Sequence, residues 1–573
     1  MLNFDTNHTF DGLANIPEYK LTDIEAKITF KQGHFIHIEL HLKEDLKYSL
    51  NKITNIHFNL EKGSIFISDI KADMYNEIFS HKNYSFTAKT AIFTHAKDFD
   101  WSTFKINKIS LHTTNINKWL YFSLPDDYIE IIKEIDNYKS QINIKNIQYA
   151  DHKLNITDSF IYIKDKKKDD LYKLTVKGYI NVEDISNNFD INEIKIIIGN
   201  LELLLCVLTN YPQSPVTVKL NEKMFFYQAN SSHIKVSNPN SHLDFAFWFN
   251  MLRDDSMQDI FTNLFNKIDT IKSTYHGLWG IINNPTDHFY DDVFFRIFAM
   301  LDCITRTKSP DIKIPFSKKQ KKEIRGFFAN IIEEHLKELP NRDKQYYVIK
   351  EKISNSIYYS NELSYKNRIQ YIITNYLSDE AKKIIHINSE TLDNIVELRN
   401  AFAHLNNLPN FFYTEGHVIY NKTLLLIFYL LWKDLGISDK VIFGNLKRTF
   451  NVLKYGCNPK ELDIYHGTLF IALGDKEFKK LSLIKHGYTI PKKEKSYSDI
   501  VIEKRKNRYS INVKNTKTFK KNINSKNHTD SKDSVKELYI SCKYSEIKQV
   551  SEIWIENRDT QLKIHNVFIV EFT

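Results

Sequence analysis

The sequence predicts a multidomain α+β protein with three parts. A β-rich, sandwich-like N-terminal domain is expected over residues 1–235, an all-α helical bundle over 240–450, and a small β-rich C-terminal extension over 451–573. A length of 573 residues allows several domains of ~100–200 residues each. Apolar residues alternate with a period of two in the first part and recur at helical spacing in the second. Short apolar runs of strand length then return in the third.

The segment His34–Lys43 is the clearest strand of the first part. Its even positions are apolar and its odd positions are polar, which is typical of a half-buried strand. His37, Glu39 and His41 share the polar face, a pattern that could suggest a metal site. Successive residues on one strand face lie ~7 Å apart, and the sequence offers no fourth ligand. We therefore interpret this face as solvated.

Further strands of the N-terminal part are separated by turn residues. They are expected at Ser64–Ile70, Tyr84–Phe93, Lys105–His112, Asp158–Ile163, Leu174–Ile180, Thr217–Leu220 and Met224–Gln228. The longer, Leu-rich segment Ile194–Thr209 predicts a helix that packs on the sheet.

Helical patterns follow from about residue 240. Asp291–Arg306 carries apolar residues at helical spacing, and Ser317–Gln320 is a capping-box sequence before a helix that runs to about Leu339. More helices are expected at Asp343–Tyr359, Tyr365–Leu377 and Thr391–Leu405. Thr423–Leu435 is apolar almost all round, so we place it at the centre of the bundle.

The C-terminal part combines strand-like runs with most of the positive charge. Strands are expected at Thr468–Leu473, Asp499–Glu503, Tyr509–Val513, Glu537–Cys542 and Val567–Phe572. Residues 504–532 contain ten Lys or Arg and one acid, which equals the net charge of +9 of the entire chain. Residues 515–534 are rich in Asn and Ser, so we expect a mobile basic loop. It either gathers RNA or serves only solubility.

Composition excludes several classes of protein. The four cysteines are far apart and have no Cys/His ligand spacing, which argues against a zinc site or a disulfide framework and favours a reducing cytoplasm. The longest apolar run, Leu424–Trp432, is far short of the ~20 residues that span a bilayer, and the N-terminus does not resemble a signal peptide. We expect no membrane, metal or cofactor.

The informative motif is Glu397–His404, which reads ELRNAFAH. It contains Arg399, Asn400 and His404 in the pattern Arg-Asn-x-x-x-His. On a helix, Asn400 and His404 share a face, and the long side chain of Arg399 can reach round towards the same phosphate. The motif therefore predicts a polar face on a helix whose other side is buried.

These residue types suit RNA cleavage without a metal. A histidine can move a proton to or from the reacting oxygen, and a guanidinium can stabilise charge on the phosphate. One helix supplies one histidine, so a symmetric dimer would complete an acid–base pair. The other interpretation is a helix whose Arg and His make surface or capping contacts only.

The motif resembles that of the HEPN superfamily, helical bundles whose ribonucleases carry R-N-x3-H. The layout resembles ApeA-type anti-phage HEPN proteins, which place a β-rich domain before the bundle. The stretches that carry this likeness are Lys105–Leu120, Ile194–Leu220, Asp291–Arg306 and Ile395–Leu405. The resemblance covers about residues 1–445 and leaves 451–573 unexplained.

The resemblance implies an activity and a set of partners. Arg399 and His404 would be the catalytic pair, and Asn400 would support them. The enzyme would be a metal-independent endoribonuclease that acts as a homodimer or higher homo-oligomer through the bundle. It would cut single-stranded RNA or tRNA in abortive infection, with a phage-derived trigger sensed through the N-terminal domain. Asp302 occupies a position where some relatives carry an acid, and we expect it to be structural.

Three further hypotheses remain open. A basic cluster in one predicted helix could touch RNA phosphates, although a solvated helix face is the commoner meaning; its members are Lys318, Lys319, Lys321, Lys322 and Arg325. A non-catalytic HEPN RNA-binding or scaffold protein of a defence or toxin–antitoxin system is the main alternative function. A metal-dependent nuclease is a distant third, because Asp499, Glu503 and Lys514 are too loosely spaced for that chemistry.

Overall fold

The protein divides into two compact units in the computed structural model. The first comprises residues 1–378 and 387–456, and the second comprises 379–386 and 457–573. The structure describes residues 8–31, 34–42, 53–72, 83–97, 99–101, 105–120, 132–133, 135–166, 172–213, 215–229, 242–247, 249–252, 257–267, 277–278, 282, 290–310, 317–336, 347–352, 363–404, 407–484, 487–488, 495–506, 508–525, 531–557 and 560–572. The predicted fold class is confirmed: strands, then helices, then a second region that contains strands.

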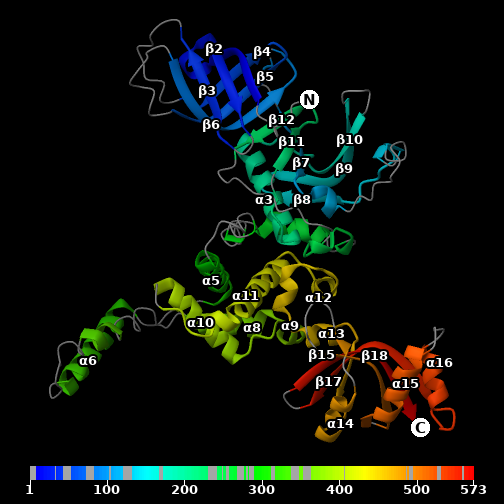
Figure 1. Ribbon diagram of the computed structural model, residues 1–573. Coiled ribbons are helices and arrows are strands. Elements are labelled where there is room, and N and C mark those ends of the chain that lie inside the picture. The colour runs from blue at the N-terminus through cyan, green and yellow to red at the C-terminus, as the bar shows by residue number, and fades with distance from the viewer. Residues whose placement is uncertain are drawn as a thin grey trace. The chain divides into compact units, whose positions relative to one another are not determined.

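The first six strands close into a barrel. They are β1 (His8–Ile16), β2 (Leu21–Phe30), β3 (Ile36–His41), β4 (Asn55–Leu60), β5 (Gly63–Ala72) and β6 (Asn83–Thr94). They run in the order β3-β2-β1-β4-β5-β6, and an antiparallel pairing of β3 with β6 closes the ring (Figure 1). In β3 the alternation is as predicted, because Ile36, Ile38 and Leu40 are buried while His37, Glu39 and His41 are exposed. The pairing of β3 with β6 that closes the ring could not be predicted from the pattern of the individual strands.

The same sheet continues beyond the barrel through β6. Residues 83–88 of β6 pair with β3, while residues 90–94 pair with β12 (Met224–Gln228). The order then runs β12-β11-β7-β10-β9-β8, with β11 (Pro215–Leu220), β7 (Lys108–Thr113), β10 (Tyr172–Asp184), β9 (His152–Lys166) and β8 (Asn143–Tyr149). Between these strands lie the short helix α1 (Ile116–Trp119) and helix α3 (Ile191–Thr209). The helix predicted at Ile194–Thr209 is therefore confirmed.

Helix α3 begins with a complete capping box. The Asp190 carboxylate accepts from the Glu193 backbone N–H, and the Glu193 carboxylate accepts from the Asp190 backbone N–H. Glu193 also bonds Nε2 of the buried His152, whose Nδ1 contacts Asp184. This network joins β9, β10 and the start of α3.

The helical region contains the bundle that the sequence predicts. Its elements are a helix at residues 257–267, α5 (Tyr290–Lys308), α6 (Lys318–Leu336), a helix at residues 347–352, α8 (Tyr365–Tyr376), α10 (Ser389–His404), α11 (Phe412–Asp434) and α12 (Asp439–Arg448). Every residue from Thr423 to Trp432 in α11 is buried, as expected for a central helix. The Trp432 indole donates to the Val207 carbonyl at 3.0 Å, which ties α11 to α3. The predicted helix Asp343–Tyr359 lies largely outside the described residues.

The C-terminal unit alternates helices and strands. It contains α9 (Asp379–Ile385), α13 (Pro459–Tyr465), β13 (Leu469–Ala472), α14 (Asp475–Lys479), β14 (Gly487–Tyr488), β15 (Lys495–Arg505), β16 (Arg508–Ile511), α15 (Val513–Ser525), α16 (Ser531–Leu538), β17 (Glu546–Asn557) and β18 (Thr560–Phe572). The sheet order is β13-β17-β18-β15-β14, with parallel pairs β15–β18 and β13–β17. Both of its faces carry apolar cores: Ile500 and Ile502 lie in one, and Val501 packs with Phe519 in the other.

Two sequence predictions about this unit are wrong. Glu537–Cys542 is not a strand, because α16 runs to Leu538 and a turn follows. The basic segment 504–532, expected to form a mobile loop over residues 515–534, is instead mostly regular structure where it is described: it contains the end of β15, β16 and α15. Residues 526–530 lie outside the described residues. A few buried side chains suffice to hold these polar helices on the sheet: Thr516 and Phe519 in α15 and Val535 in α16. Such sparse anchors are hard to recognise in a polar sequence.

Candidate functional site

Helix α10 carries the predicted motif and is anchored from its beginning. The Asn388 side chain accepts from the Thr391 backbone N–H at 2.8 Å and so caps the helix. Leu392, Ile395, Leu398 and Ala401 form its buried stripe. Near its end, Phe402 stacks on Phe294 of α5 and meets Phe412 of α11 edge to face, with ring centroids 5.5 Å and 5.8 Å apart. The last turn of α10 is therefore held between two helices.

The motif side chains project from the opposite side of this anchored turn. Asn400 and His404 are exposed, and Arg399 is partly buried. Nη1 of Arg399 donates to the Asn400 side-chain oxygen at 3.1 Å. Asn400 and His404 are four residues apart on α10 and therefore share its surface. The structure thus brings Arg399 and Asn400 into contact and leaves the imidazole of His404 accessible.

Arg399 rests on an aromatic ring that the sequence analysis did not single out. Its guanidinium carbon lies 5.4 Å from the ring centroid of Tyr365, at the start of α8. The guanidinium of Arg368, one turn further along α8, lies 5.9 Å from the same ring. Both distances fall within the ~6 Å range of cation–π attraction. Tyr365 therefore positions the catalytic candidate Arg399.

An acid from α5 completes this group. Asp302 forms an ion pair with Nη2 of Arg368 and accepts from Nε of Arg306 at 3.2 Å. Arg368 is buried and also donates to the Leu363 carbonyl at 2.5 Å. We call Asp302, Tyr365, Arg368 and Arg399 the Tyr365 cluster. Its contacts agree with the structural role expected for Asp302, which neutralises a buried guanidinium.

The phenol of Tyr365 stays protonated in this setting. Burial and the nearby charge of Asp302 raise its pKa, against the opposing effect of Arg399 and Arg368. Among the residues that the structure describes, its hydroxyl has no hydrogen-bond partner. The ring face is therefore the part of Tyr365 that interacts with the motif. An arginine among the buried positions of α8 was the signal in the sequence that could have revealed this cluster.

The basic cluster predicted to touch RNA lies on α6. The predicted capping box is present, since Ser317 and Gln320 exchange hydrogen bonds of 3.2 Å and 2.8 Å. Lys318, Lys319 and Lys322 are exposed, and Lys321 and Arg325 are partly exposed. These cations are accessible to a polyanion.

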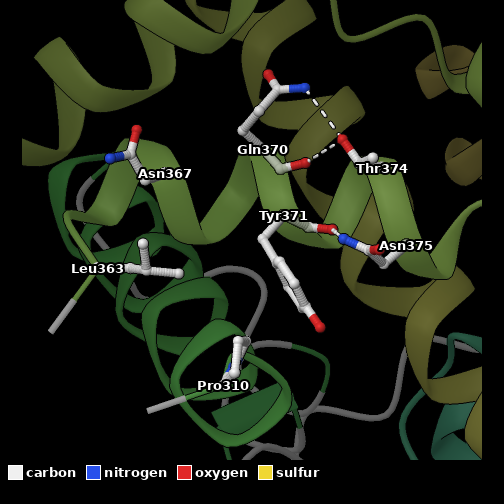
Figure 2. A pocket seen from close by; sticks show the side chains of 7 residues that line it. All are labelled: Pro310, Leu363, Asn367, Gln370, Tyr371, Thr374 and Asn375. Carbon is white, nitrogen blue, oxygen red and sulfur yellow. Dashed lines mark hydrogen bonds between the residues drawn. The ribbon is translucent and has the colours of Figure 1, made fainter. Parts of the chain in front are cut away.

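A shallow hollow of about 420 Å³ lies along α8. Figure 2 shows Pro310, Leu363 and the α8 side chains around it, among them Tyr371 and Thr374. Thr374 follows Tyr365 by nine residues, which at 100° per residue places them about 180° apart around the helix. The hollow therefore faces away from the Tyr365 cluster and is not part of the motif surface.

The third hypothesis, a metal-dependent nuclease in the C-terminal unit, finds no support in the geometry. Asp499 accepts from Ser498 and Asn566, while Glu503 accepts from Asn512 and Tyr539. The two carboxylates therefore engage separate partners. In the described ranges, no group of three or more His, Cys, Asp or Glu side chains is arranged to hold a metal ion.

Comparison with known families identifies the helical region. Residues 300–441 match the family model described as Apea-like HEPN, so this segment is an ApeA-type HEPN domain. HEPN domains are generally ribonucleases. The match runs from within α5 to the start of α12 and includes the motif and the Tyr365 cluster. No curated protein and no solved structure matches the chain.

The match covers about a quarter of the chain. The barrel, the rest of the N-terminal sheet and nearly all of the C-terminal unit lie outside it. No helix among the described residues is long and apolar enough to cross a membrane.

Proposed function

We propose that the protein is a metal-independent HEPN endoribonuclease and an effector of abortive anti-phage defence. The observation that carries this proposal is the surface of α10, where Arg399, Asn400 and an accessible His404 lie together within the ApeA-type HEPN domain. Its substrate would be single-stranded RNA or tRNA, because a shallow, exposed motif suits an extended strand better than an enclosed small molecule.

The chemistry follows from the three side chains. Neutral His404 takes the proton of a ribose 2′-hydroxyl, whose oxygen attacks the adjacent phosphorus. The bond from phosphorus to the 5′-oxygen breaks, and that oxygen leaves with a proton from a second imidazole. The products are a 2′,3′-cyclic phosphate and a 5′-hydroxyl. Arg399 stabilises the charge that develops on the phosphate oxygens.

The second imidazole would come from His404 of another copy of the chain. The motif supplies one histidine per chain, so a homodimer or higher homo-oligomer would bring two motifs to one RNA. Within each chain, the contacts of Arg399 with Asn400 and Tyr365 hold its guanidinium beside the surface of α10, where the RNA would lie.

Two contacts support a regulatory, trigger-sensing role for the N-terminal region. The indole of Trp432 in α11 donates to Val207 in α3, and its ring lies 4.7 Å from that of Phe247. Helix α11 in turn contacts the motif helix through Phe412 and Phe402. A phage-derived ligand that displaces α3 would therefore act on the helix next to the motif.

The test compares His404→Ala with wild type. Purified protein is incubated with RNA in the presence of EDTA, and cleaved ends are sequenced with and without enzymatic removal of a cyclic phosphate. Loss of a general acid–base group lowers the rate by about 10²–10⁴-fold. His417→Ala, which removes an exposed histidine from α11, is the matched control and should cut normally. Equal cleavage by His404→Ala and wild type would contradict the proposal.

The alternative is a non-catalytic HEPN RNA-binding or scaffold protein. The packing of Arg399 against Tyr365 favours it, because a guanidinium that already has an aromatic partner can serve structure alone. This alternative predicts RNA binding without cleavage, unaffected by His404→Ala or Arg399→Ala.

A further inference from the structure

Two lysines and a histidine lie side by side in the N-terminal sheet, outside the segment that matches the family model. His112 lies on β7, which runs between β11 and β10, and Thr217 of β11 lies opposite it in the strand register. Lys177 of β10 donates to the Thr217 hydroxyl at 3.2 Å. The ammonium of Lys219 on β11 lies 4.9 Å from the ring centroid of Tyr179, and that ring lies 5.5 Å from the imidazole of His112. We call these five residues the His112 cluster.

The His112 cluster is positively charged and has no counter-charge among the described residues. None of their carboxylates forms an ion pair with Lys177 or Lys219; Glu222 attracts Lys219 from further away, but its own ion pair is with Lys108. Burial and the charge of Lys177 lower the pKa of Lys219. Both lysines of the cluster are partly exposed, so a small anion can reach them from solvent. A bound anion would offset the repulsion between the two ammonium groups.

His112 determines which anion fits. It is buried, and its Nδ1 donates to the Gly178 carbonyl at 2.7 Å, so this nitrogen carries the proton. Burial and the charges of both lysines outweigh this hydrogen bond and lower the pKa of His112 to about 4, which keeps the ring neutral. Nε2 is therefore a hydrogen-bond acceptor. An anion beside this nitrogen must bring a hydrogen of its own.

A phosphate group with a free acidic oxygen meets both requirements. It carries the negative charge that the lysines need, and its second pKa of about 6 leaves a proton available near neutral pH. Sulfate has the same shape but holds no proton at this pH. The phosphodiester of an RNA backbone has a single charge and no acidic hydrogen. The chemistry of the His112 cluster therefore favours free phosphate or a phosphomonoester over both.

We propose that the His112 cluster binds a phosphate group that has a free acidic oxygen, either inorganic phosphate or the terminal phosphate of a nucleotide. The ammonium groups of Lys177 and Lys219 hold its charged oxygens, and its hydroxyl donates to Nε2 of His112. Thr217 positions Lys177, and the ring of Tyr179 positions Lys219. The site does not rest on the proposed ribonuclease activity.

The test measures binding of radiolabelled inorganic phosphate and, separately, of radiolabelled AMP to the full chain by equilibrium dialysis at neutral pH. Wild type is expected to bind at least one of them saturably. Lys177→Gln and Lys219→Gln should each weaken binding by about tenfold or more, because each change removes a charge-assisted hydrogen bond. Lys223→Gln is the matched control, since it removes an exposed lysine from the turn between β11 and β12. Wild type that binds neither probe, cluster variants that bind like wild type, or an equal loss in the control overturns the proposal.

Competitors identify the ligand. Unlabelled sulfate, and the dinucleotide ApA, whose phosphate is a diester, should compete about tenfold more weakly than the labelled probe or less well still. If either competes equally, the site does not require a hydrogen on the ligand and the proposal fails. Displacement by AMP but not by adenosine assigns the site to a nucleotide. Displacement by phosphate but not by AMP assigns it to the free ion, and both of these results support the proposal.

Discussion

Replacing Tyr365 tests whether its ring holds Arg399 for catalysis. The guanidinium carbons of Arg399 and Arg368 lie 5.4 Å and 5.9 Å from the centroid of this ring, which comes from a residue only 9% exposed. Tyr365→Leu keeps an apolar side chain and removes the aromatic face. Tyr365→Phe keeps the face and removes only a hydroxyl that has no hydrogen-bond partner among the described residues.

The expected losses of activity and of stability depend on how exposed Arg399 and Arg368 are. Arg399 is partly exposed, so its cation–π contact contributes about 0.5–1 kcal/mol, which corresponds to about a two- to fivefold loss in kcat/KM for Tyr365→Leu. Arg368 is buried, so the same change removes about 2 kcal/mol from the free energy of unfolding through that second contact. Tyr365→Phe should cut RNA within about twofold of wild type and be at least as stable, because a buried hydroxyl without a partner is unfavourable.

The assay is the initial rate of RNA cleavage at several RNA concentrations, beside thermal unfolding of the same preparations. Because Tyr365 acts through Arg399, the Leu change should have little further effect in an Arg399→Ala background. Two results would refute the reasoning. One is cleavage by the Leu variant at the rate of wild type, since the aromatic face would then be unimportant. The other is a Phe variant as impaired as the Leu variant, since the hydroxyl would then be the important group.

Three other predictions follow from the structure. Burial opposes the charged form of His152, but its hydrogen bonds to Asp184 and Glu193 outweigh this and raise its pKa. The stabilisation is therefore complete below about pH 6.5 and is lost as the pH rises through the folded-state pKa. The melting temperature of His152→Gln should fall further below that of wild type at pH 6 than at pH 8.5; an equal difference would contradict the network. Asp302→Asn should lower the free energy of unfolding by about 3 kcal/mol, because it leaves the buried Arg368 without its counter-charge, and the added change Arg368→Met should recover part of that loss in a denaturant titration. Replacing the lysines of α15 by glutamine should weaken RNA retention and flatten its dependence on salt in a filter-binding titration, whereas an unchanged salt slope would assign these lysines to solubility.

Sequence patterns predicted best those helices and strands whose buried positions form a regular pattern of apolar residues. Strand β12 matches its predicted range, and the buried core of α11 coincides with the apolar run from Thr423. Helices that are held by only a few buried side chains were not predicted from the sequence. Helix α15 is held by Thr516 and Phe519 in an otherwise polar segment, so composition alone suggested a loop. Strand β15 contains the strand predicted at Asp499–Glu503 and extends beyond it at both ends. Its apolar residues lie in cores on both faces of the sheet, so burial does not alternate along it.

In the candidate site, too, the local features could be predicted from the sequence and the long-range contacts could not. The motif is short, since it runs only from Arg399 to His404 and includes Asn400. Local spacing on one helix was therefore enough to predict a shared polar surface. Tyr365 and Asp302 lie on two other helices, and both precede Arg399 in the chain by more than thirty residues. Nothing local in the sequence connects them with Arg399.

The sequence by itself determined the order of strand-rich and helical regions, the central apolar helix and the motif on α10. Each of these depends on periodicity within a few turns of one chain segment. The tertiary structure decided the barrel, because its closure needs the pairing of β3 with β6 across more than forty residues. It also decided which ring supports Arg399. Both features depend on contacts between residues far apart in the sequence. Such contacts are decided by which surfaces pack together once the helices and strands have formed.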